Sequence, residues 1–174
     1  MSASPMPPSR SPLPSVAEAR EALLAWLRDP AAAATASLGS TPLALIERLE
    51  QGQPADLRRD AALLRGVWEL RWSSSALPYR AVAPWIENLQ LLDPEAGQGM
   101  NLLRLAGPLG PVAGIAVQAA VAIAPAAGAD PCQRVSVRFE RGGWLGPCFG
   151  DNRLQLLRQV RQGFPAWLDI TVLD

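Results

Sequence analysis

The stretch that decides the fold is Gly66-Val67-Trp68-Glu69-Leu70-Arg71-Trp72. Its residues alternate strictly: Trp68, Leu70 and Trp72 fall on one side of an extended chain, and the residues between them fall on the other. A period of two is typical of a half-buried β-strand. This stretch is therefore predicted to begin a β-sheet, with its indole-bearing face toward the interior of the protein.

Upstream of this strand the sequence has a helical pattern. Ser15 and Glu18 have the spacing of a capping box at the start of a helix over 16–28. Two further helices are predicted over 42–52 and 55–64, each followed or ended by a glycine. A Ser/Pro-rich leader over 1–15 is predicted to be disordered.

Downstream of the helical part the pattern changes to strands. Strands are predicted over 67–73, 85–92, 100–105, 115–124, 134–140 and 167–173, and one short helix over 154–162. Helices followed by strands indicate an α+β fold with an antiparallel sheet. A closed small barrel that holds one ligand needs about eight strands. We therefore expect N-terminal helices packed on an antiparallel β-barrel that is incomplete or open.

The composition excludes several function classes. The 174 residues include 16 arginines, 16 acidic residues, no histidine and no lysine, so the net charge is zero. A neutral chain offers no basic field for nucleic acid. Without histidine and lysine the usual general bases and Schiff-base chemistry are absent. We expect no enzyme, no metal and no cofactor.

Two features bear on compartment. Cys132 and Cys148 lack the companion residues of a metal motif, so free thiols in a reducing compartment are favoured, with a disulfide left open. Segment 105–129 is uncharged but rich in Ala, Gly and Pro, which argues against a transmembrane helix. No secretory signal pattern is seen at the N-terminus.

Four segments carry a resemblance to a known family. They are 64–74 (Leu-Arg-Gly-Val-Trp-Glu-Leu-Arg-Trp-Ser-Ser), 86–90 with the turn over 93–101, 134–140 (Arg-Val-Ser-Val-Arg-Phe-Glu) and 167–174 (Trp-Leu-Asp-Ile-Thr-Val-Leu-Asp). In this order they resemble the plastid lipid-associated proteins, also called plastoglobulins or plant fibrillins. The Gly-x-Trp at 66–68 is also similar to the entry motif of lipocalin-like barrels. The resemblance implies one domain over 16–174, with a helical preface over 16–65 and a lipocalin-like barrel part over 66–174.

The family pattern differs from this chain at two places. Members usually have Tyr where Trp72 stands, and they continue past the last motif with a further strand. In lipocalin-like barrels a late-strand Arg often lies over the Gly-x-Trp indole. An open barrel, without such a cap over Trp68, is the expectation for this chain.

The candidate ligand site follows from the inward-facing apolar residues. Seven side chains are predicted to line a cavity: Trp68, Leu70, Trp72, Val135, Val137, Phe139 and Ile170. The two indoles either face a ligand or pack as ordinary core. Arg134 and Arg138 either contact a polar head group or lie on a solvated strand face. Trp144, predicted on a Gly-rich loop, either touches a membrane or cavity mouth or belongs to the core.

The sequence indicates two alternative functions. The first, implied by the resemblance, is non-catalytic binding or organisation of hydrophobic lipids or isoprenoids, such as quinones or carotenoids, at photosynthetic membranes. The location would be cytoplasmic or peripheral to thylakoids in a cyanobacterium, or a plastid in a eukaryote. The alternative is a scaffolding protein that binds a protein partner through an open sheet edge.

Overall fold

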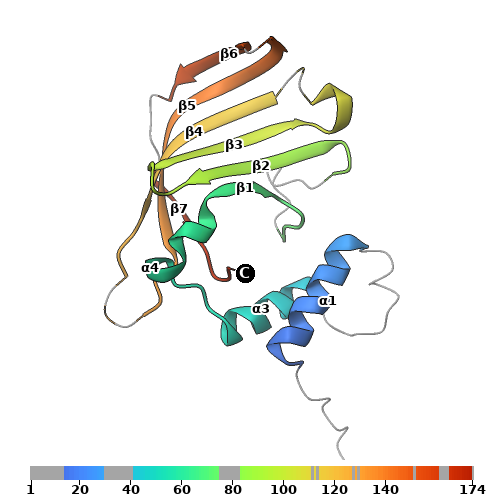
Figure 1. The fold of residues 1–174 in the computed structure, drawn as a ribbon, viewed down its shortest axis with the longest axis vertical. Helices are drawn as coiled ribbons and strands as arrows, with labels where there is room; N and C mark the ends of the chain where they lie inside the picture. The colour runs from blue at the N-terminus through green and yellow to red at the C-terminus, as the bar shows by residue number, and fades with distance from the viewer. Residues whose placement is uncertain are drawn as a thin grey trace, which may run out of the picture. The chain divides into compact units, whose positions relative to one another are not determined.

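The computed structural model describes residues 14–29, 41–74, 83–110, 112, 114–126, 128, 130–150, 152–160 and 165–173. The chain divides into two compact units, Met1–Gly52 and Gln53–Asp174. The predicted leader lies outside the described residues, apart from Pro14 and Ser15. Figure 1 shows the helices of the first unit and the sheet of the second.

The described part of the first unit, residues 14–29 and 41–52, contains the helices α1 (Val16–Arg28) and α3 (Pro42–Gly52), which have the predicted bounds. The capping box is present: the Ser15 backbone N–H donates to Glu18 Oε2 at 2.7 Å, and the Glu18 N–H donates to Ser15 Oγ at 3.2 Å. These bonds lower the pKa of Glu18. The two helices contact each other, and a Cβ placed on Gly52 would lie 2.2 Å from Val16 Cγ2. Glycine at the end of α3 therefore allows this close approach.

The second unit is built on one antiparallel sheet of seven strands, which is not closed into a barrel. The short helix α4 (Leu57–Asp60) and the 3-10 helix η1 (Ala61–Leu64) precede it. The strands are β1 (Gly66–Glu69), β2 (Ile86–Asp93), β3 (Gln98–Leu105), β4 (Gly114–Ile123), β5 (Arg134–Phe149), β6 (Asn152–Gln159) and β7 (Pro165–Asp169). Their order is β1-β2-β3-β4-β5-β6, and β7 also pairs with β5.

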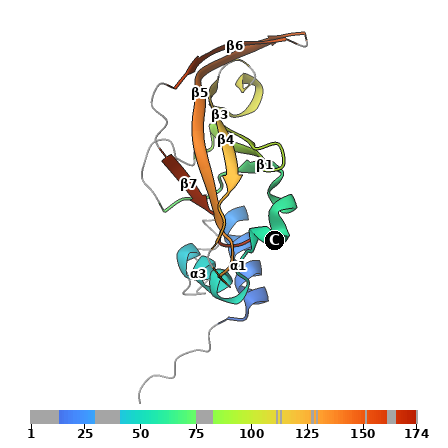
Figure 2. The same cartoon turned by 90° about the vertical axis from the view of Figure 1, so that its left-hand side faces the viewer.

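Strand β5 holds two strands along one edge. Its first part, from Arg134 to Arg138, pairs with β7, and its second part, from Arg141 to Phe149, pairs with β6 (Figure 2). The register shifts twice along β5, where an extra residue bulges opposite β4 and again opposite β6. Pro147 lies at the second bulge, a position where a strand tolerates a missing N–H.

Two predictions about this region are wrong. Residues 152–159 form strand β6, where a helix over 154–162 was predicted. Trp144 lies inside β5 and not on a loop. Both errors have one cause, because pairing between β5 and β6 overrides the local helical and turn preferences of these residues. A third difference is that β1 ends at Glu69, so Trp72 lies outside the strand.

The main core lies on one face of the sheet, which we call the core face. Leu92, Val121 and Val135 point from it toward Leu57 and Leu64, and all five are buried. Backbone hydrogen bonds fix the covering segment, because Ala55 N–H donates to Thr171 O at 2.9 Å and Leu57 N–H to Cys132 O at 2.7 Å. Cys132 is a buried free thiol and Cys148 an exposed one. The opposite face carries a smaller cluster around Leu102, Ala116 and Leu145.

Asp56 ties the start of α4 to the sheet. Its Oδ1 accepts the backbone N–H of Arg58 at 3.1 Å and of Cys132 at 3.2 Å, while Arg58 donates to its Oδ2 at 2.8 Å. The hydrogen bond from the Arg58 side chain, helped by the two N–H groups, lowers the pKa of Asp56 to about 2. The carboxylate thus acts as a helix cap and as a link between two segments distant in sequence.

We expect Asp56→Asn to lower the free energy of unfolding at neutral pH. Because the folded state depresses the pKa, the contribution of the carboxylate is present above about pH 4 and is lost as the pH falls toward the folded pKa. Urea titrations between pH 7 and pH 3 should show the gap between wild type and variant shrinking. Asp130→Asn is the control, since Asp130 contacts Arg58 through its backbone carbonyl. A gap independent of pH would contradict this role.

Candidate binding site

The sequence-predicted cavity residues lie in two different places. Val135 is buried in the main core, and Val137 and Ile170 pack against that cluster. The space beside them is filled by Leu57, Leu64 and other core side chains. Phe139 is half-buried and pairs with Ala119. Val135, Val137 and Ile170 therefore contribute to the packed core.

The tryptophans of the opening strand lie at the edge of the sheet. Trp68 is on the core face, opposite Gln90, but its side of β1 has no further strand among the described residues, and it is 40% exposed. Its indole Nε1 donates to Leu64 O at 2.9 Å, which fixes the ring against the end of η1. Leu70 and Trp72 are half-buried beyond the strand. Trp68 thus packs against the end of η1 but remains partly exposed.

The two predicted head-group arginines are engaged in ion pairs on the opposite face. Arg134 holds Asp169 with two hydrogen bonds, Nε to Oδ1 at 2.7 Å and Nη2 to Oδ2 at 2.8 Å, and lies 5.4 Å from the centre of the Trp167 ring. The Arg134 hydrogen bond lowers the pKa of Asp169. Arg138 contacts Glu140 at 3.3 Å. Both arginines are exposed and lie on the face away from Val135.

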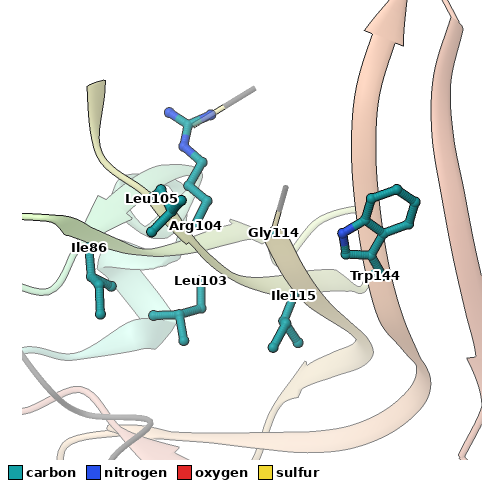
Figure 3. Close-up of a pocket in the computed structure, with 7 residues that line it drawn as sticks. All are labelled: Ile86, Leu103, Arg104, Leu105, Gly114, Ile115 and Trp144. Carbon is teal, nitrogen blue, oxygen red and sulfur yellow. The ribbon is translucent and has the colours of Figure 1, made fainter. Parts of the chain in front are cut away.

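An apolar depression opens on the core face, at the ends of β2, β3 and β4 that lie away from the core residues Leu92 and Val121. It has a volume of about 220 Å³ and is lined by Ile86, Leu103, Arg104, Leu105, Gly114, Ile115 and Trp144. None of the seven predicted cavity residues lines it. In Figure 3 the Ile86, Leu103 and Ile115 side chains point to the same side, while the Arg104 guanidinium points away. Arg104 instead pairs with Glu87.

The strand register brings these lining residues together. Ile86 lies opposite Leu105, Leu103 opposite Ile115, and Ile115 opposite Trp144. Opposite residues of an antiparallel pair share a face, so these side chains from β2, β3, β4 and β5 form one surface. The sequence indicated each alternating pattern, but the register that joins them depends on contacts between strands.

The Trp144 ring lies against Gly146 of the same strand. A Cβ placed on Gly146 would lie 2.4 Å from the Trp144 indole, so the ring lies directly over this glycine. Glycine thus provides the space for a large ring to lie along its own strand. The Gly-rich sequence around Trp144, which suggested a loop, serves this packing within a strand.

The apolar surface continues beyond the depression onto β6. Leu156 lies opposite Trp144, and Leu154 follows on the same face. Ile115 and Leu156 are 59% and 64% exposed. We call Leu103, Leu105, Ile115, Trp144, Leu154 and Leu156 the apolar strip. A contiguous exposed apolar surface of this kind marks a contact site for a ligand, a membrane or a protein.

The chemistry available at the strip is that of apolar contact. Arg104 contributes its side chain to the lining but its charge is paired with Glu87. In the described ranges no group of three or more acidic residues or cysteines is placed to hold a metal ion. No described helix is long and apolar enough to cross a membrane. The exposed apolar side chains of the strip can hold an apolar chain or ring by burial and shape.

Comparison with protein-family models, curated protein sequences and solved structures gave no match.

Proposed function

We propose that the protein binds a hydrophobic lipid or isoprenoid without catalysis and holds part of it on the apolar strip. The observation that carries this proposal is the exposed apolar surface from Leu103 to Leu156, hollowed beside Trp144. Segments 64–74, 134–140 and 167–174, which resemble plastid lipid-associated proteins, support the same function. In this proposal the open sheet is a lipocalin-like barrel left open, and the protein works at the periphery of photosynthetic membranes.

The size of the depression limits how the ligand is held. Drug-sized ligands usually fill enclosed pockets of about 300–1,000 Å³. A depression of about 220 Å³ that opens to solvent accommodates one ring or a short length of chain. The rest of the ligand would lie along Ile115 and Leu156 or remain in the membrane. Binding would gain about 25 cal/mol for each Å² of apolar surface removed from water.

Ile115→Asp is expected to weaken ligand binding by about tenfold or more, because a buried carboxylate beside the ligand loses its hydration. The test is equilibrium binding of a quinone with a decyl side chain, followed by quenching of Trp fluorescence. Val67→Asp is the matched control, since Val67 is 65% exposed on the opposite face of β1. Both sites are exposed, so both variants should fold. Equal binding by the two variants would contradict the proposed site, and no binding by wild type would contradict the function.

The alternative function, scaffolding through an open sheet edge, is supported by a separate observation. Among the described strands β1 pairs only with β2 and β6 only with β5, so each leaves one edge unpaired. A partner protein can add a strand to such an edge. Chemical crosslinking in cell extract, with mass spectrometry of the linked peptides, tests this alternative. Reproducible links from a partner to β1 or β6 would support it, and their absence would count against it.

A further inference from the structure

We infer that β6 is a self-complementary edge and that two copies of this chain pair through it, antiparallel, to continue the sheet. This inference is independent of ligand binding. The unpaired edge of β6 pairs with β6 of a second copy of the chain and not with another protein.

The backbone of β6 presents regular, outward-pointing hydrogen-bonding groups. Val160 N–H donates to Glu140 O at 2.8 Å, so residue 160 faces β5. Backbone groups alternate along a strand, and the bulge opposite β6 lies in β5, so β6 itself stays regular. The N–H and C=O groups of Arg153, Gln155 and Leu157 therefore point away from β5. No described strand pairs with them.

The side-chain order of β6 selects one register for self-pairing. If Gln155 lies opposite Gln155 of the second copy, Arg153 lies opposite Leu157, and each of these pairs exchanges backbone hydrogen bonds. Leu154 then lies opposite Leu156 of the second copy, and Leu156 opposite Leu154. These are the positions without backbone bonds, where opposite Cα atoms approach to about 4.5 Å and side chains touch most closely.

Neighbouring registers fit less well. A shift of two residues in one direction places Leu154 opposite Arg158, and a shift in the other places Leu156 opposite Asn152. In the selected register the exposed leucines on the core face, Leu154 and Leu156, cover each other across the two-fold axis. The apolar strip then runs continuously from one copy to the other.

The charges of β6 are compatible with this pairing. Its charged residues are Arg153 and Arg158. In the selected register Arg153 lies opposite Leu157 and Arg158 opposite Asn152, so no like charges face each other. Edge strands that avoid pairing usually carry lysine, proline or inward charges in their centre. The centre of β6, Leu154-Gln155-Leu156-Leu157, has none of these.

Gln155→Pro tests the edge, because proline removes an N–H that points away from β5. The single chain loses no described hydrogen bond, and edge strands tolerate such a proline. Sedimentation of the full chain should show a dimer for wild type and for Gln155→Thr, and a monomer for Gln155→Pro. Wild type that remains a monomer at its highest soluble concentration would overturn the inference. So would a Gln155→Pro variant that still dimerises.

A cysteine crosslink tests the register and serves if Gln155→Pro does not fold. In a Cys148→Ser background, Gln155→Cys places two cysteines opposite each other at a backbone-bonded pair, with Cα atoms about 5.5 Å apart, within the range that a disulfide spans. Oxidation should crosslink this variant at least about tenfold faster than Leu63→Cys, an exposed cysteine on η1. Equal rates would overturn the dimer. Faster crosslinking by Leu156→Cys would overturn the register.

Discussion

Gly143→Ala is expected to displace β6 and to lower the free energy of unfolding by about 2–4 kcal/mol. A Cβ on residue 143 would lie 2.1 Å from the carbonyl oxygen of Leu156, and the obstacle is backbone, which cannot rotate aside. The φ angle of Gly143 is +156°, which side-chain-bearing residues rarely adopt. Close pairing of β5 with β6 thus requires glycine at this position.

Gly142→Ala is the matched control for this prediction. It is the neighbouring residue of the same strand, and its Cβ would meet the nearest atom at 3.7 Å. Where alanine fits, replacing glycine stabilises a protein by about 0.4–1 kcal/mol through the unfolded chain. Chemical denaturation measures both variants. If Gly143→Ala is as stable as Gly142→Ala, β6 does not lie against β5 as described.

The same substitution links β6 to function. Displacing β6 removes Leu154 and Leu156 from the apolar strip and disrupts the edge through which we propose that two copies pair. Gly143→Ala should therefore be monomeric and should bind the quinone more weakly than Gly142→Ala. Ile115 and Leu103 come from β4 and β3, so some binding should remain.

Leu64→Ala is expected to lower the free energy of unfolding by about 2–5 kcal/mol. The Leu64 side chain is 2% exposed and belongs to the core cluster that η1 and the preceding segment form with the sheet. Truncation removes apolar contacts and leaves a cavity between η1 and the core face. In the variant the backbone carbonyl of residue 64 still accepts the hydrogen bond from the Trp68 indole N–H. The decrease in the free energy of unfolding therefore measures lost packing and not a lost hydrogen bond.

Leu63→Ala provides the control within the same turn. Leu63 is 56% exposed, so its truncation should change the free energy of unfolding by less than about 0.5 kcal/mol. Thermal or urea unfolding compares the two variants directly. A small effect of Leu64→Ala would mean that the region beside Val135 is not packed. It would then favour a ligand site near Trp68 and Val135, as the sequence predicts.

The sequence predicts most of the local structure of this chain because the signals are local. The start of α1 follows from the Ser15–Glu18 spacing of a capping box. The alternation of Val135 and Val137 with charged residues predicts the first part of β5. These signals act within one or two turns, so they need no knowledge of partners.

The errors arise where pairing between distant segments decides the outcome. Leu154, Leu156 and Leu157 fit a helix face as well as a strand, and only the β5 partner selects the strand. Gly142, Gly143 and Gly146 suggest a loop, but they serve a close backbone approach and the Trp144 ring. The sequence does not predict the apolar strip, because its residues come from four strands, β3 to β6, whose register the sequence does not reveal.

Trp68 shows a partial success of the same kind. The alternating pattern places it on the core face, as its pairing with Gln90 confirms. Its burial depends on what lies beside β1, and among the described strands β1 is an edge. The face of the sheet on which a side chain lies can therefore be predicted from the two-residue alternation alone. Its exposed fraction at a sheet edge cannot.

The most direct test of the central claim uses a spin-labelled fatty acid and the methyl NMR signals of the protein. If a hydrophobic ligand binds the apolar strip, the label will broaden the signals of Leu103, Ile115 and Leu156 at substoichiometric amounts. The core signals of Leu64 and Val135 will remain sharp. Broadening confined to residues around Trp68, or no selective broadening at all, would contradict binding at the apolar strip.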